Sequence, residues 1–375
     1  MNRRVTIFLT TFTTLLSITV IAILVARGYT YNFAEKEIKK TGMILAQSTP
    51  SEAKVYLDGK LVETTNSVLD SVTPGMHNLE IKKEGFTTWE KEVEVFEGLI
   101  TEIDALLVLR SPRLNPMTAS GIEIAKISPT GERIAYTSRR SDPPGIWVLE
   151  LTSPSLLNII QENPRLIAAD TLTRTFSLAE NLEWGPKENT LLVTLNPRGY
   201  VVLDTRRGTQ EEATTSAEPT LAEWETAIKE KRKEWLNKIE IEEEFEDIAL
   251  DPNTKWSHDE KRFLFTKDSE KHTEWHVYNG EKPLGVGKKR HYLALRKGKD
   301  SNTRVSWYAT SKHLIIQEEK KISVIDIDGK NQKEVYSGNL EEGFPVTATP
   351  DGSNLIILTS FKENSPPNLY ALGIR

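Results

Sequence analysis

Five segments in the C-terminal two thirds of the chain repeat one pattern, a short polar turn followed by a run of apolar residues. The runs are too short for helices, and Pro, Gly, Asn or Asp in the turns supply the constrained or left-handed backbone that a reversal needs. A second apolar run follows each one. The five segments are residues 127–136, 184–193, 256–265, 307–316 and 348–357. The pattern predicts a repeated unit of at least three short antiparallel strands.

Repetition of one small β unit is typical of a β-propeller, in which each sheet buries its faces only against neighbouring sheets. The segment Trp256-Ser257-His258-Asp259-Glu260-Lys261-Arg262-Phe263-Leu264-Phe265 resembles the Trp-Ser-Pro-Asp-Gly-Lys-x-Leu-x-Phe repeat of TolB-like β-propellers. It departs from that repeat at His258 and Glu260, where the family has Pro and Gly. The resemblance implies a five- or six-bladed β-propeller over residues 110–375.

The last repeat is followed by residues for only part of a blade. A sheet left open there would expose unpaired backbone groups. We therefore expect the stretch from Leu109 to Gly121 to supply the closing outer strand.

The interval between the second and third repeats is the longest, and residues 219–245 have the rhythm of an amphipathic helix. Thr220 with Glu223 three residues later predicts a capping box at its start. The apolar positions of the helix are Leu221, Trp224, Ile228, Trp235 and Ile239. We expect an inserted helix on one rim of the propeller, with Trp224 and Trp235 as candidate binding residues.

Residues 42–109 precede the repeats and predict a small β-sandwich, with strands at 43–46, 53–57, 77–81 and 89–95. Asp58-Gly59 is a two-residue hairpin signal. The segment resembles a PEGA domain, an extracytoplasmic β module, in Ser48-Thr49-Pro50, in residues 53–60 and in residues 72–86. Pro50-Ser51-Glu52-Ala53 stands where that family has Pro-Glu-Gly-Ala. The resemblance implies a fold and no catalytic residues.

An apolar run starts at Val5 and stops at Val25, as long as the ~20 residues that a helix needs to cross a bilayer. Its threonines can return their hydroxyls to the helix backbone. Because it is longer than the apolar part of a cleavable signal peptide, we expect an uncleaved membrane anchor, with a cleaved signal as the alternative. Arg3 and Arg4 favour a cytoplasmic N-terminus and an extracytoplasmic bulk. Basic residues also follow the run, so the reversed topology stays open.

The chain has no cysteine, which excludes disulfides, thiolate metal sites and cysteine catalysis. Its net charge of -6 gives no reason to expect nucleic acid as a partner. Neither a phosphate loop nor a Gly-x-Ser-x-Gly elbow is present. His272 and His276 lack the His-Glu-x-x-His pattern and lie in a predicted strand, so we expect no metal site and no cofactor.

Two oppositely charged segments remain as candidates. Lys288, Lys289 and Arg290 begin a basic patch that suits an anionic glycan, a lipid headgroup or the acidic cluster of residues 240–247. Trp184, Trp256 and Trp307 precede the turns of their repeats. We expect these three rings to pack between blades rather than to form a carbohydrate platform.

These patterns predict a membrane-anchored, extracytoplasmic binding protein that presents its propeller to another protein or to a cell-envelope polymer, without catalysis. Two alternatives follow from the same residues. A propeller hydrolase resembling a glycosidase would gather carboxylates from separate blades at the central channel. A scaffold facing the cytoplasm would follow from the reversed topology.

Overall fold

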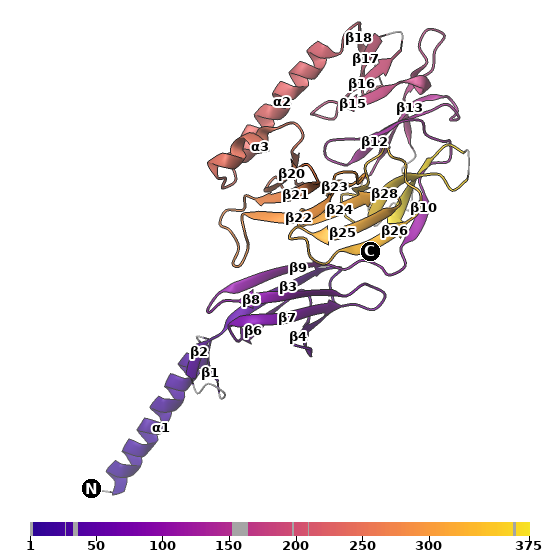
Figure 1. Ribbon diagram of the computed structural model, residues 1–375. Helices are drawn as coiled ribbons and strands as arrows, with labels where there is room; N and C mark the ends of the chain where they lie inside the picture. Colours follow the sequence, from indigo (N-terminus) through magenta and orange to yellow (C-terminus); the bar gives the residue numbers. More distant parts are fainter. Residues whose placement is uncertain are drawn as a thin grey trace. The chain divides into compact units, whose positions relative to one another are not determined.

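The structure is a computed structural model, which describes residues 3–26, 28–32, 37–151, 164–196, 199–208, 210–362 and 365–375. Its backbone divides into two compact units (Figure 1). The first unit comprises Met1–Leu107 and Leu284–Lys288, and the second comprises Val108–Pro283 and Lys289–Arg375. Strands dominate both units, as the β-sandwich pattern predicts for the first and the repeated apolar runs predict for the second.

The first unit begins with helix α1 (Arg3–Ala26). Its window Val5–Leu24 has a mean hydropathy of 2.2, and none of it is buried, so it is long and apolar enough to cross a membrane. The hydroxyls of Thr13 and Ser17 donate to the carbonyls four residues earlier, at 2.8 and 2.9 Å. The predicted return of hydroxyls to the backbone is confirmed. A hairpin of β1 (Tyr29–Asn32) and β2 (Glu37–Lys40) follows.

Two sheets form the small domain that follows. One has the order β6-β3-β9 and the other β5-β4-β7-β8. The strands are β3 (Gly42–Thr49), β4 (Lys54–Leu57), β5 (Lys60–Thr64), β6 (Ser67–Val72), β7 (Gly75–Lys82), β8 (Trp89–Val95) and β9 (Ile100–Leu106). Apolar side chains of both sheets share one core, which confirms the β-sandwich. Asp58 and Gly59 both have positive φ in the β4–β5 hairpin, as their sequence predicts.

The described part of the second unit contains five four-stranded antiparallel sheets. The first sheet contains β11 (Ala125–Ile127), β12 (Arg133–Ser138), β13 (Gly145–Glu150) and β14 (Arg165–Ala169), and the second contains β15 (Asn181–Trp184), β16 (Thr190–Leu195), β17 (Gly199–Asp204) and β18 (Gln210–Thr214). The third sheet contains β19 (Lys255–Trp256), β20 (Arg262–Asp268), β21 (His272–Asn279) and β22 (His291–Gly298). The fourth contains β23 (Arg304–Trp307), β24 (His313–Glu318), β25 (Lys321–Asp326) and β26 (Lys333–Ser337). A short 3-10 helix, η1 (Phe176–Leu178), joins the first two.

The fifth sheet combines the two ends of the second unit. It has the order β10-β29-β28-β27, from β10 (Arg113–Pro116), β27 (Thr347–Ala348), β28 (Asn354–Thr359) and β29 (Asn368–Gly373). Its outer strand β10 pairs with β29, and the Leu109 N–H donates to the Ile374 carbonyl at 2.8 Å. The predicted closing strand is confirmed (Figure 1), and the propeller has five sheets in the described residues.

Alternation along the second strand of each sheet decides which neighbour each side chain meets. In β12, Ile134 and Tyr136 pack with residues of the fifth sheet, and Ala135 packs with the second. In β20, Leu264 occupies the position of Ala135 and packs with the fourth sheet. Phe263 and Phe265 occupy the positions that face the preceding sheet.

The insertion between β18 and β19 covers that face of the third sheet. It consists of α2 (Glu218–Leu236), η2 (Glu243–Phe245) and α3 (Glu246–Leu250). Phe245 and Ala249 form one core with Phe263, Phe265 and Tyr278 of the third sheet. A helical segment therefore occupies a position that a neighbouring sheet occupies at other boundaries.

The predicted helix over 219–245 is too long, because α2 ends at Leu236, and η2 and α3 follow as separate turns. The predicted capping box is wrong. The N-cap is Ala217, which makes no side-chain cap hydrogen bond, and Pro219 lies in the first turn, where its missing N–H costs no helical hydrogen bond. The helix thus starts before Thr220.

Candidate binding site

Hydrogen bonds join the first strands of neighbouring sheets, which in a propeller surround the central channel. The indole of Trp184 donates to the Lys126 carbonyl of β11 at 2.9 Å, and that of Trp307 donates to the Lys255 carbonyl of β19 at 2.8 Å. The Ser306 hydroxyl donates to the Val346 carbonyl at 3.0 Å. For Trp184 and Trp307, packing between blades is confirmed.

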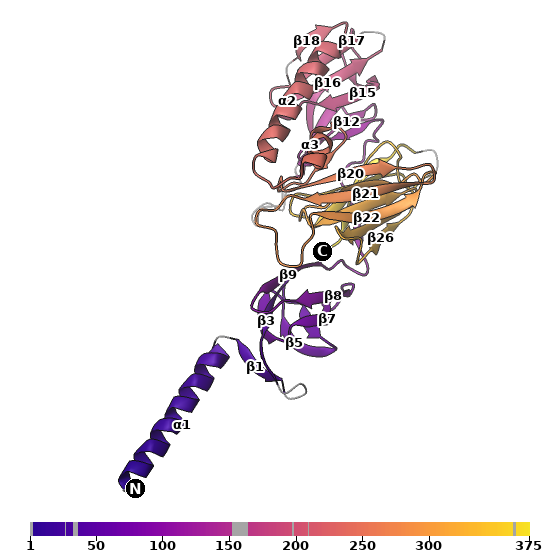
Figure 2. The same cartoon turned by 60° about the vertical axis from the view of Figure 1, so that its left-hand side comes forward.

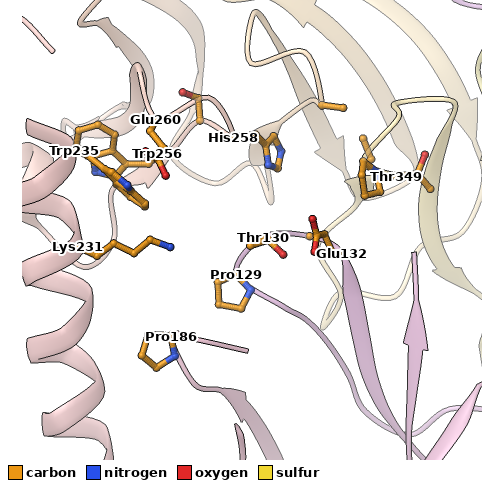
Figure 3. A pocket seen from close by; sticks show the side chains of 15 residues that line it. Pro129, Thr130, Glu132, Pro186, Lys231, Trp235, Trp256, His258, Glu260 and Thr349 are labelled. Atoms are coloured by element: carbon orange, nitrogen blue, oxygen red, sulfur yellow. The ribbon is translucent and has the colours of Figure 1, made fainter. Parts of the chain in front are cut away.

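The turn after each first strand faces one cavity of about 320 Å³ (Figure 3). We call this region the channel mouth. Each sheet contributes the same position of its turn, namely Pro129, Pro186, His258, Ala309 and Pro350. Four of these positions are apolar, and His258 is the single polar one, at a place where the repeat departs from the family pattern.

Helix α2 supplies the remaining wall through Lys231 and Trp235 (Figure 3). The Lys231 ammonium lies 5.2 Å from the centre of the Trp235 ring, a cation–π contact. The Trp235 ring lies 5.1 Å from that of Trp256. Trp256 differs from Trp184 and Trp307, because its indole donates to the Ala249 carbonyl in α3 at 2.9 Å rather than to a neighbouring sheet.

Arg232 holds α2 in place beside the channel mouth. Its side chain is buried, and its guanidinium donates to four carbonyls of the segment that leads into β19. The acceptors are Leu250 at 3.3 Å, Asp251, Pro252 at 3.3 Å and Thr254 at 3.0 Å. A planar guanidinium with five N–H donors suits such a set of acceptors. Sequence reasoning missed this residue, because nothing in a helical pattern identifies a buried arginine.

Several polar groups of the channel mouth are free to meet a ligand. In the described residues, no hydrogen bond or ion pair engages the His258 ring or the Glu132 carboxylate. The His258 side chain is exposed, but the protein groups around its ring desolvate it enough to lower the pKa of its imidazole, against the opposing charge of Asp259. By contrast, Glu260 is paired with Lys238 at 3.0 Å.

The candidates from the sequence lie in different places. Trp235 lines the channel mouth. Trp224 packs beside the second sheet, where a Cβ added at Gly185 would lie 3.1 Å from its ring. Figure 2 shows α2 alongside that sheet. Lys288 closes a turn through its N–H to the Gly285 carbonyl, at 3.1 Å.

The other two basic candidates differ in exposure. Lys289 is exposed, and its backbone N–H donates to the Tyr292 hydroxyl at 2.7 Å. Arg290 is used inside the second unit. It pairs with Glu240 of the insertion and donates to the Glu281 carbonyl at 2.6 Å. The basic patch thus meets the acidic cluster, one of its three predicted partners, through this ion pair.

Residues 41–110 match the PEGA domain. No curated protein matches the sequence. Among solved structures, TolB from Acinetobacter baumannii aligns with 80% of this chain at 13% identity and a TM-score of 0.27. The alignment spans 61% of the length of that protein.

Two further solved structures are similar. An oligogalacturonate lyase from Vibrio parahaemolyticus aligns over 70% of this chain and 97% of its own, at 6% identity and a TM-score of 0.30. A chain of a mitotic checkpoint complex aligns over 71% and 83%, at 10% identity and a TM-score of 0.29. The protein combines an apolar N-terminal helix, a segment that matches the PEGA domain and a propeller of five sheets in the described residues.

Proposed function

We propose that the protein is a non-catalytic binding protein of the cell envelope, which α1 anchors in a membrane and which holds its ligand at the channel mouth. The ligand is another protein or an envelope polymer, on the extracytoplasmic side. One observation carries the proposal: turns from all five sheets and helix α2 meet around one cavity.

The chemistry of this cavity suits recognition. Ligand sites combine apolar walls with a few polar groups that fix orientation. Here the Trp235 and Trp256 rings and three prolines supply apolar surface, while Lys231, His258 and Glu132 supply an ammonium, an imidazole and a carboxylate. Because these groups come from separate elements, they can orient a ligand in three directions.

A non-catalytic role rests on the sequence, which offers no nucleophile paired with a base. Of the two carboxylates in the cavity wall, Glu132 and Glu260, the second is held by Lys238, so the wall offers no pair of free carboxylates. Glu188, close by, accepts hydrogen bonds from the backbone N–H and the hydroxyl of Thr130. A carboxylate that is held by such partners stabilises the fold and is not free to act as an acid or a base.

Photo-crosslinking with the full-length protein in membranes tests the proposal. A benzophenone amino acid replaces Lys187, exposed beside Pro186 at the channel mouth, or Leu172, exposed in the connection between β14 and β15. We expect an adduct from position 187 and none from position 172. Trp235→Ala is expected to reduce the adduct at position 187 about tenfold, equivalent to ~1.4 kcal/mol of binding free energy.

Equal adducts from both positions, or an adduct at 187 that Trp235→Ala leaves unchanged, contradict binding at the channel mouth. A ligand recovered in cleaved form supports the hydrolase instead. Protease treatment of intact cells tests the topology, since loss of the propeller under this treatment rejects the scaffold that faces the cytoplasm.

A further inference from the structure

Two histidines of the third sheet share a hydrogen bond. His276 Nδ1 and His291 Nε2 lie 3.0 Å apart, across the β21–β22 pair. The other ring nitrogen of His276 lies 3.0 Å from a carboxylate oxygen of Glu274. His276 is buried, with 7% of its surface exposed. Glu274, His276 and His291 thus form a continuous chain of hydrogen bonds.

This chain accommodates one added proton but not two. A singly protonated pair keeps its hydrogen bond, since one ring nitrogen donates and the other accepts. The charge on His276 is then balanced by Glu274. With both rings protonated, two N–H groups point at each other across 3.0 Å, and the hydrogen bond becomes a repulsion between like charges.

The pair lies directly beneath the insertion. We call residues 240–250 the latch. The ring of Phe245 in the latch lies 5.4 Å from the His291 ring and 4.7 Å from that of Tyr278. The Glu242 N–H donates to the Tyr278 hydroxyl at 2.9 Å. The latch therefore rests on His291 and Tyr278, and its position depends on theirs.

The surrounding charges do not offset a second proton. Glu274 is already engaged by His272 at 3.3 Å and by Arg296. Its hydrogen bond to His276 lowers the pKa of Glu274, so it stays ionised in mild acid. Burial, His276 and Lys267 lower the pKa of His291, and only Glu244 of η2 acts in the opposite direction.

We propose that the His276–His291 pair makes attachment of the latch sensitive to acid. Protonation of both rings releases residues 240–250 from the third sheet. The latch follows α2, and its last residue, Leu250, accepts a hydrogen bond from Arg232 of that helix. Release of the latch therefore also loosens α2, which carries Lys231 and Trp235 at the channel mouth. Attachment of the insertion to the third sheet then depends on pH.

The sign of the effect follows from linkage. A histidine whose pKa is lowered in the closed form regains its ordinary pKa of ~6.5 on release, so the released form binds more protons. The latch is therefore fully stabilised above that pKa and loses stability as the pH falls through it. Uptake of one proton raises the ratio of released to closed protein by up to about tenfold per pH unit.

Spin labels on the full chain in detergent test the proposal. The chain has no cysteine of its own, so labels at Glu246→Cys in the latch and Glu270→Cys in the β20–β21 turn are unambiguous. Both positions are exposed. We expect one narrow distance between the labels at pH 7.5 and a second, longer population at pH 5.5.

His291→Gln is expected to abolish the longer population, because an amide oxygen accepts from a protonated His276 without repulsion. His77→Gln, which removes a histidine from β7 in the first unit, keeps the acid response. His276→Gln serves as a second variant if His291→Gln releases the latch at both pH values. Two results overturn the proposal. One is a single narrow distance between the labels at both pH values in the protein that keeps His276 and His291. The other is a longer population at pH 5.5 that survives both substitutions. The measurement needs no ligand, so its result is independent of the proposed function.

Discussion

The third sheet packs differently on its two sides, although the same repeat forms both. One side faces the fourth sheet, and the other faces the insertion that precedes the third sheet. On the former side, Leu264 packs directly with Val305 and Leu314 of the next sheet, and the Trp307 indole donates to the Lys255 carbonyl. On the latter side, Phe263 and Phe265 pack with Phe245 of the insertion, and the Trp256 indole donates to α3. The repeat therefore determines which faces are apolar, while the intervening chain determines what covers them.

The largest expected difference between the two sides comes from core truncation. Phe245→Ala removes a buried ring from the insertion and is expected to cost about 3–5 kcal/mol of its attachment, as for other buried Phe→Ala changes. Because the loss is local, protease sites in residues 237–254 should open before the propeller unfolds. Leu314→Ala, at about 2–5 kcal/mol, should instead lower the midpoint of denaturant unfolding of the whole second unit. Identical behaviour of the two variants contradicts the distinction.

A smaller effect is expected from Arg232, which acts on one side only. Arg232→Met keeps the aliphatic bulk but leaves the carbonyls of residues 250, 251, 252 and 254 without their donor, at a cost of about 1–3 kcal/mol. Arg232→Lys should recover only part of this, because an ammonium cannot span four acceptors. Thermal unfolding and proteolysis of the insertion measure both variants. If Arg232→Lys restores the full stability, the positive charge alone holds α2 in place.

The smallest expected effect separates two tryptophans at equivalent positions. Trp307→Phe and Trp256→Phe each remove one indole N–H from a carbonyl, at a net cost of about 1 kcal/mol. Trp307→Phe should lower the Tm of the second unit. Trp256→Phe should mainly increase amide exchange in α3, whose Ala249 carbonyl loses its donor. A lower Tm without faster exchange in α3 for Trp256→Phe goes against a separate role for the insertion.

Local signals predicted the β part of the fold well. Turn residues and short apolar runs identified all five repeats, and the cost of an open sheet edge placed the closing strand within residues 109–121. The Asp58-Gly59 hairpin followed from the same turn chemistry. The turns and hairpins depend on interactions between residues close in sequence. The closing strand follows from counting the strands that the last repeat lacks.

The insertion was predicted less well, because its contacts are with residues distant in sequence. The spacing of apolar residues predicted α2 but not its length. Pro219 lies at its start, and Phe245 after its end packs into the core of the third sheet. Arg290, a candidate for binding, is paired with Glu240 instead. His258 was visible in the sequence as a departure from the repeat, and only the structure places it at the channel mouth.

The closing strand also sets the order in which the protein can be completed. Strand β29 lies between β10 and β28, so it is hydrogen-bonded on both edges by segments from opposite ends of the second unit. The fifth sheet therefore cannot assemble until the ribosome has synthesised residues 368–373, after the whole of the first four sheets, the last of which ends at Ser337. During that interval β10 waits as an unpaired strand, and a chain shortened by its last eight residues would keep that strand exposed to aggregation.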